Sequence, residues 1–226
     1  MNSIMKLFNT HLISLFFLGI VIVACNTQEE MKESRVEVLP YYQDATFTPQ
    51  WIEPGSPILD TFHRISPFQL INQDGEEVTE KTFAGKIYVT DFFFTVCPGI
   101  CPKMTANMSL LQEEFLQDDE VFLLSHSVTP TWDSVSVLKT YANNKGVITN
   151  KWHLVTGEQE QIYKLGRRDY FVEEDLGIEK DIDEFLHTEN FVLVDKYRYI
   201  RGIYNGLNKS SIQQLIIDIK TLKKEG

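Results

Sequence analysis

The strongest constraint on the fold is a nearly continuous apolar run at residues 86–95, rich in aromatic and β-branched side chains. A strand of this kind suits the centre of a sheet that is covered on both faces. Apolar strands follow at residues 121–128 and 152–156, and helical spacing of apolar residues appears at 102–117 and 133–143. Strands that alternate with helices predict an α/β fold.

Two hairpins flank these alternating units. Residues 68–79 contain an Asp-Gly turn, and residues 191–204 form a second pair of short apolar runs. An amphipathic helix is expected at residues 210–223, with Ser210 or Ser211 as its N-cap. We therefore predict a mixed sheet flanked by helices, with an N-terminal β-hairpin extension.

The first 24 residues have the pattern of an export signal. Lys6 is the only charged side chain in them, and the apolar run at residues 12–24 is too short to cross a bilayer comfortably. The run ends in Ile-Val-Ala before Cys25, which resembles a bacterial lipoprotein lipobox. This predicts cleavage before Cys25, lipidation of that cysteine and an extracytoplasmic domain anchored to a bacterial membrane. An uncleaved anchor or an ordinary signal cut elsewhere would also export the domain.

The rest of the chain divides into a tether and one domain. Residues 26 to about 40 are polar without apolar periodicity, and residues 41–60 are interpreted as an irregular entry that can include one short strand. Residues 1–24 are therefore predicted as signal peptide, 25–60 as lipidated cysteine and tether, and 61–226 as the folded domain. The net charge of −11, with scattered basic residues, argues against nucleic acid as a partner.

The number of cysteines indicates that they have a chemical and not a structural role. Lipidation of Cys25 would leave Cys97 and Cys101, which are too few and too close together to form a structural disulfide framework. A disulfide across so short a loop would add little stability. We therefore expect these two cysteines to have a chemical role, although an inert disulfide between them stays open.

The local sequence favours reactive sulfurs. Pro102 suits the first position of a helix, which would make Cys101 the N-cap and put Cys97 in the preceding turn. Gly99 would allow the tight turn that brings the sulfurs together. The positive end of the helix dipole favours thiolates, which attack disulfides and bind soft metals. Three residues separate these cysteines, one more than in the familiar redox dithiol, and this leaves room for an ion.

A third ligand is offered by His187. In thioredoxin-like redox enzymes, the loop before the corresponding strand faces the dithiol and carries a proline, but no proline follows Gly157 here. Two thiolates and an imidazole can hold copper as Cu(I) or Cu(II), or zinc with a water molecule. A surface histidine without a ligand role stays open. We interpret His63, His126 and His153 as packed or hydrogen-bonded side chains.

These features together resemble the Sco/SenC family of copper-binding proteins. The resemblance implies a thioredoxin-like fold and one copper ion per domain, bound by Cys97, Cys101 and His187. The first functional hypothesis is a metallochaperone or copper sensor, not a turnover enzyme. The implied partner is a cytochrome c oxidase subunit or another copper recipient, to which it delivers copper or whose cysteines it reduces. The resemblance extends roughly over residues 65–225 and rests on residues 93–102, 125–133, 154–157, His187 and 191–195.

The chain departs from the family pattern in two places. Gly99 stands where the family usually has Asp, and residues 127–133 lack the usual Asp before Pro130 and the Arg after it. These departures leave the implied ligands in place but bear on the partner and on the redox step.

Two other functions fit the same cysteines. A thiol–disulfide oxidoreductase would use Cys97 as the attacking thiolate and Cys101 as the resolving thiol. A thiol peroxidase would need an activating arginine, for which Arg167 and Arg168 are available.

Overall fold

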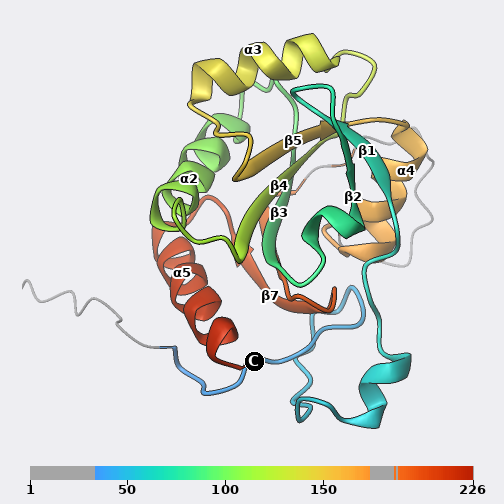
Figure 1. Cartoon of the computed structure of the whole chain (residues 1–226), viewed down its shortest axis with the longest axis vertical. Coiled ribbons are helices and arrows are strands. Elements are labelled where there is room, and N and C mark those ends of the chain that lie inside the picture. Colours follow the sequence, from blue (N-terminus) through green and yellow to red (C-terminus); the bar gives the residue numbers. More distant parts are fainter. Residues whose placement is uncertain (1–33, 174–185, 187, 226) are drawn as a thin grey trace, which may run out of the picture. The chain divides into compact units, whose positions relative to one another are not determined.

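The computed structural model describes residues 34–173, 186 and 188–225, so Cys25 and His187 lie outside the described residues. Within the described residues the chain forms a seven-stranded sheet with helices on both faces (Figure 1). The strands are β1 (Gln69–Asn72), β2 (Glu77–Thr79), β3 (Ile87–Phe93), β4 (Val121–Ser127), β5 (Trp152–Thr156), β6 (Asn190–Val194) and β7 (Ile200–Asn205). The helices are η1 (Pro57–Thr61), η2 (Glu80–Phe83), α2 (Cys101–Glu114), α3 (Val135–Lys145), α4 (Gln159–Lys164), η3 (Leu165–Asp169) and α5 (Lys209–Lys224).

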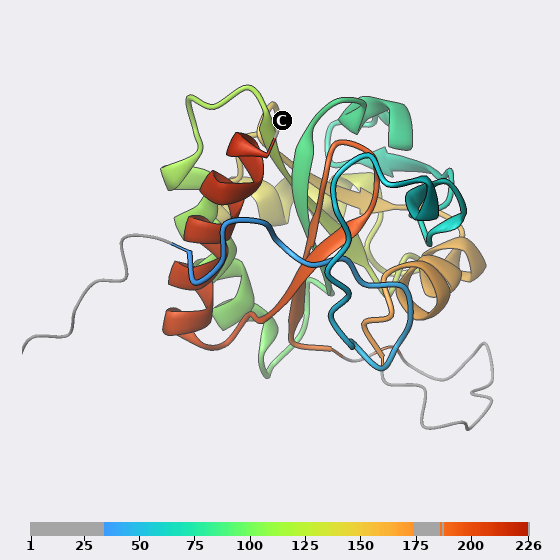
Figure 2. The ribbon, with the colours of Figure 1, turned by 90° about the horizontal axis from the view of Figure 1, so that it is seen from below.

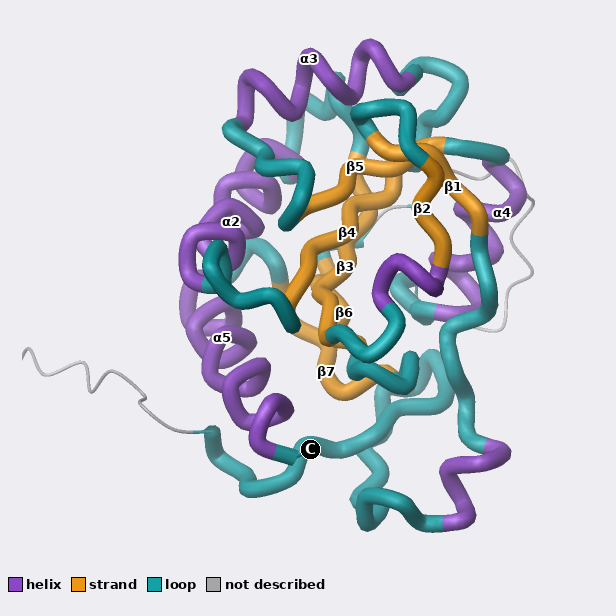
Figure 3. Tube along the Cα trace, in the orientation of Figure 1, coloured by secondary structure: helices purple, strands orange, loops and turns teal. Residues whose placement is uncertain are grey.

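The sheet is mixed, as predicted. Its strand order is β2-β1-β5-β4-β3-β6-β7, with β3, β4 and β5 parallel at the centre. The antiparallel pairs β1–β2 and β6–β7 extend it at its two edges (Figure 3). Gly75 has a φ of 80° in the first turn, a conformation that glycine adopts without strain. Both predicted hairpins are therefore confirmed.

Two apolar cores lie on opposite faces of the sheet. Helices α2, α3 and α5 cover one face, and α4 with η2 covers the other (Figures 1 and 2). Alternation along β3 explains the division, because Val89 and Phe93 join the first core whereas Tyr88 and Phe92 join the second. Met104 and Met108 of α2 are fully buried in the first core. The expectation that these methionines are core residues is confirmed.

Two helix starts differ from the prediction. The N-cap of α2 is Ile100, which makes Cys101 the first helical residue and Pro102 the second. Since Pro tolerates either position in the first turn, the sequence alone did not fix the start to one residue. The N-cap of α5 is Asn208, whose side chain accepts hydrogen bonds from the backbone amides of Ser210 and Ser211. The predicted serine caps are therefore wrong.

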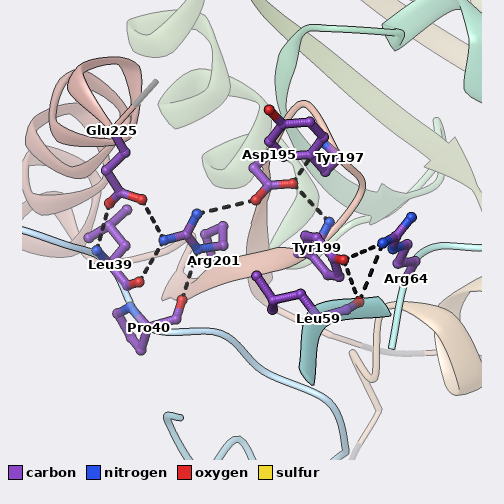
Figure 4. Close-up of polar contacts among 9 residues, drawn as sticks. All are labelled: Leu39, Pro40, Leu59, Arg64, Asp195, Tyr197, Tyr199, Arg201 and Glu225. Carbon is purple, nitrogen blue, oxygen red and sulfur yellow. Dashed lines mark hydrogen bonds and ion pairs between the residues drawn. The ribbon is translucent and has the colours of Figure 1, made fainter. Parts of the chain in front are cut away.

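Residues 34–60, the described part of the predicted tether, pack against the domain. Leu39 and Tyr41 are buried, and the backbone amide of Tyr42 donates to the carbonyl of Ile200 in β7. The Arg201 guanidinium donates to the carbonyls of Leu39 and Pro40 (Figure 4). Among the helices of the described residues, none is long and apolar enough to cross a membrane.

Candidate dithiol and metal site

The two cysteines lie where β3 passes into α2. Cys97 is partly exposed in the connecting loop and Cys101 is buried in the first turn of the helix; both are free thiols. A Cβ atom added at Gly99 would lie 3.9 Å from the Cys97 Sγ, which is ordinary van der Waals contact. Gly99 is also not among the described glycines that have a positive φ. The turn therefore does not depend on glycine, contrary to the sequence-based expectation.

The two thiols are chemically unequal. Burial raises the pKa of Cys97, but hydrogen bonds from the Cys101 side chain and from the backbone amides of Gly99, Ile100 and Cys101 outweigh burial, so the pKa is lowered overall. Burial and the neighbouring Cys97 raise the pKa of Cys101 to about 12. Cys97 is therefore the thiol that is poised as a thiolate, and Cys101 loses its proton only when its partner or a metal compensates.

A buried carboxylate fixes the loop before the cysteines. Asp133 accepts hydrogen bonds from the Thr95 amide (3.2 Å) and hydroxyl (2.5 Å), and from the hydroxyls of Ser127 (2.6 Å) and Thr129 (3.0 Å). These donors come from the dithiol loop and from the end of β4. Asp133 thus ties the two segments together, a role that sequence reasoning missed. The sequence signal for this role was the presence of two hydroxyl residues, Ser127 and Thr129, shortly before Asp133.

A second buried carboxyl, Asp91, faces the core on the side of α2. It accepts a hydrogen bond from the Ser125 hydroxyl, which in turn accepts one from the Trp152 indole at 2.8 Å. Burial raises the pKa of Asp91 to about 7. Its charge also contributes to the raised pKa of Cys101. Asp91 was part of a run interpreted only as an apolar strand, so its role was not predicted.

The raised pKa of Asp91 predicts an unusual pH dependence of stability. Folding favours its protonated form, so the stability present below about pH 4 is lost as pH rises through about 7. Asp91→Asn has no carboxyl to titrate, so the variant does not lose stability in this way. The free energy of unfolding of Asp91→Asn minus that of wild type should therefore rise by about 4 kcal/mol between pH 4 and pH 8. Denaturant unfolding at several pH values measures the difference.

Asp74 provides the control of opposite sign. It is paired with Lys139, and this hydrogen bond lowers its pKa. Its contribution is therefore fully present above the unfolded pKa of about 4 and is lost as pH falls below it, so Asp74→Asn should be less stable than wild type by a constant amount above about pH 4, and this difference should shrink at lower pH. If Asp91→Asn behaves like Asp74→Asn, Asp91 is ionised in the folded protein and the assignment is wrong.

The three histidines within the described residues are engaged elsewhere. His126 is buried, stacks on Phe92 and shares a 3.0 Å hydrogen bond with Thr90, and burial lowers its pKa to about 3. His153 contacts Asn72, and His63 bonds the backbone carbonyl of Asp169. The expectation that these are packed or hydrogen-bonded residues is confirmed.

The position of His187 is not described, but the strand that follows it is. β6 pairs antiparallel with β3, with Thr90 opposite Val192. The start of β6 at Asn190 therefore lies at the end of β3 from which the cysteine loop emerges. Leu186 and Thr188 are both buried. Within the described residues, no three His, Cys, Asp or Glu side chains gather to hold a metal ion.

The fold and the site define a class: a thioredoxin-like domain with a dithiol at the start of the helix that follows a central strand. The model of the SCO1/SenC family matches residues 58–224 of this chain. The protein belongs to the SCO1/SenC family.

Three solved structures show the same fold at high coverage. A SCO1/SenC family lipoprotein from Bacillus anthracis is 31% identical, with a TM-score of 0.62 over 71% of this chain and 95% of its own. BsSco, described with a disulfide switch and as a member of the Sco family of cytochrome c oxidase assembly proteins, is 30% identical, with a TM-score of 0.60 over 71% and 93%. ScoI from Bradyrhizobium japonicum, solved with copper bound, is 26% identical, with a TM-score of 0.54 over 69% and 96%.

Proposed function

We propose that this protein binds one copper ion and takes part in assembling the copper centre of a respiratory oxidase. The observation that carries the proposal is the dithiol itself. Cys97 is accessible and has a lowered pKa, and Cys101 lies one helical turn away at the positive end of α2. The relatives described as an oxidase assembly protein and as a copper-bound protein support the choice of cargo and partner.

The donor set fits copper. Two sulfurs favour Cu(I), and an imidazole helps to hold Cu(II), so Cys97, Cys101 and His187 would retain the ion in either state. Copper is the cargo here, and the protein's own residues control its release. Because the proton on Cys101 is held tightly, copper binding should release it, and the return of a proton would favour release of the ion.

Membrane attachment is part of the proposal. The Cys25 motif supports lipidation, and a relative from Bacillus anthracis is described as a lipoprotein. The described chain between residues 34 and 42 already lies against β7 and α5, so only the few residues between Cys25 and Ser34 separate the proposed anchor from the packed segment.

The test of the ligand set is His187→Ala. Anaerobic titration of the full chain with Cu(I) and with Cu(II) should show wild type binding one equivalent of each. We expect the variant to lose Cu(II) binding by more than about 100-fold, because removing a direct ligand costs more than the roughly 10–100-fold lost with groups that only orient ligands. His63→Ala is the matched control and should leave both titrations unchanged. Unchanged Cu(II) affinity in His187→Ala would remove the histidine from the site.

A thiol–disulfide oxidoreductase is the second candidate, and the unequal thiols favour it. A thiolate at Cys97 can attack a target disulfide, after which Cys101 displaces the target thiol. This function predicts that His187→Ala keeps full disulfide-reducing activity. The peroxidase alternative gains no support from Arg167, which pairs with Glu173 and packs over Tyr163 on the face opposite α2.

A further inference from the structure

Three exposed apolar side chains form a rim on the loop that carries the accessible thiol and on the loop that Asp133 ties to it. Val96 is 75% exposed and Ile100 is 38% exposed, and these residues flank Cys97 in the loop. Trp132 is 77% exposed, the highest value among the large apolar side chains of the described residues. Isolated apolar residues on a surface need no explanation, but a cluster beside a reactive group indicates an interaction site.

The hydrogen bonds of Asp133 hold this cluster together. Thr95 precedes Val96, Asp133 follows Trp132, and Thr95 donates to Asp133 through both its amide and its hydroxyl. Trp132 and Val96 are therefore each one residue from a hydrogen-bonded pair in which Asp133 is buried and Thr95 is half-buried. The backbone that presents them is fixed, so a partner would not have to order the loop on binding.

A shallow groove lies beside the loop that carries the cysteines. It has a volume of about 350 Å³ and lies between the dithiol loop and α3. Its lining contains no charged side chain and consists of Thr95, Ser136, Val137, Thr140, Tyr141 and Asn144. Thr95 lines the groove and directly precedes Val96, so the groove adjoins the rim, and together they form a path whose side chains carry no charge other than that of the Cys97 thiolate.

The charge of this path differs from that of the whole protein. The chain carries a net charge of −11, yet residues 94–102 contain no ionisable side chain other than the two cysteines. Asp133, the only acid between residues 127 and 134, is fully buried by its hydrogen bonds. Apart from the Cys97 thiolate, a cationic partner would find no counter-charge here, whereas an apolar segment would find matching surface.

We propose that the surface formed by Val96, Ile100 and Trp132, with the adjoining groove, binds an uncharged, apolar stretch of the recipient protein that flanks the recipient's own cysteines. This proposal rests on the proposed function, because a recipient must bring its sulfur to Cys97 and in doing so covers these side chains. Trp132 serves as the anchor, since large, rigid aromatic side chains dominate the binding energy of small interfaces. The protein thereby selects its recipient by the residues beside the recipient's cysteines.

The test uses the reduced, metal-free full chain and two synthetic peptides. Each peptide has one cysteine activated as a mixed disulfide with pyridinethiol; one has apolar flanking residues and the other has alternating Lys and Glu. The Cys97 thiolate attacks the peptide sulfur, a new disulfide forms, and the released pyridinethiol is measured by absorbance. The apolar peptide should react at least tenfold faster. Trp132→Ala should remove most of this preference, and Trp132→Phe should keep it.

Two controls separate docking from thiol chemistry. Trp51→Ala removes a tryptophan that is 63% exposed in a different part of the chain and should leave the preference intact. A small activated disulfide without a peptide should react equally with wild type and Trp132→Ala. Equal rates for the two peptides with wild-type protein, together with normal copper binding, would overturn the docking proposal and leave the proposed function standing. Loss of copper binding in the wild-type titration would overturn both.

Discussion

Cys97→Ser and Cys101→Ser are each expected to lose tight copper binding, with affinity for Cu(I) falling by more than about 100-fold. A hydroxyl is a poor ligand for a soft ion and stays protonated at neutral pH. The two variants should still differ in folding: Cys97 is partly exposed, whereas Cys101 is buried against the core beneath α2. Competition titration against a Cu(I) chelator measures the affinity, and thermal unfolding checks the fold.

Met104→Leu is the matched control for these variants. Met104 lies three residues after Cys101 and carries another soft sulfur, but it is fully buried in the apolar core. The substitution nearly conserves volume, so it should leave both stability and copper affinity close to wild type. A large loss of affinity in Met104→Leu, or tight Cu(I) binding that survives in both serine variants, would contradict the assignment of the dithiol as the copper site.

The second large effect is expected from Arg201→Met, which should destabilise the fold by about 3–5 kcal/mol. Arg201 is buried and bridges Asp195 at 3.2 Å and Glu225 at 2.6 Å (Figure 4). Its loss leaves two buried carboxylates without a cation. It also frees the backbone carbonyls of Leu39 and Pro40. The N-terminal segment and the end of α5 should therefore loosen together, which hydrogen exchange at residues 39–42 and 222–225 can detect.

The control for this prediction is an exposed ion pair. Lys220 bonds Glu114 between α5 and α2, and both side chains are about half exposed. Lys220→Met should change the free energy of unfolding by less than about 1 kcal/mol. A similar small effect for Arg201→Met would show that the buried network contributes little and that the N-terminal segment is held by its apolar contacts alone.

The architecture was predictable because the apolar periodicities were unambiguous. The run at residues 86–95 became β3 at the centre of the sheet, and the strand expected at residues 152–156 is β5 with those bounds. Helix starts were less predictable, since several polar residues near Asn208 can cap a helix equally well. The packing of residues 34–60 was not predicted because their apolar residues have no regular spacing, and because part of their contacts come from a residue distant in the sequence, Arg201.

The place of the two cysteines after the central strand could be predicted from the sequence, but the residues that support them could not, and the ligand set stays a prediction. The spacing of the cysteines is visible in the sequence. Nothing in the sequence distinguishes Asp91 and Asp133 from surface acids, because their burial and hydrogen bonds depend on the fold. The difference in pKa between the two thiols likewise depends on burial and amide geometry that no spacing reveals. The exposed position of Trp132 also required the structure, because an aromatic residue in a turn is as often packed as free.

The most direct test of the proposed copper site is X-ray absorption spectroscopy of the copper-loaded full chain. The expected spectrum has two sulfur ligands and one imidazole nitrogen, and the imidazole signal disappears in His187→Ala while both sulfurs remain. A spectrum with a single sulfur, or an imidazole signal that persists in His187→Ala, would contradict a site built from Cys97, Cys101 and His187.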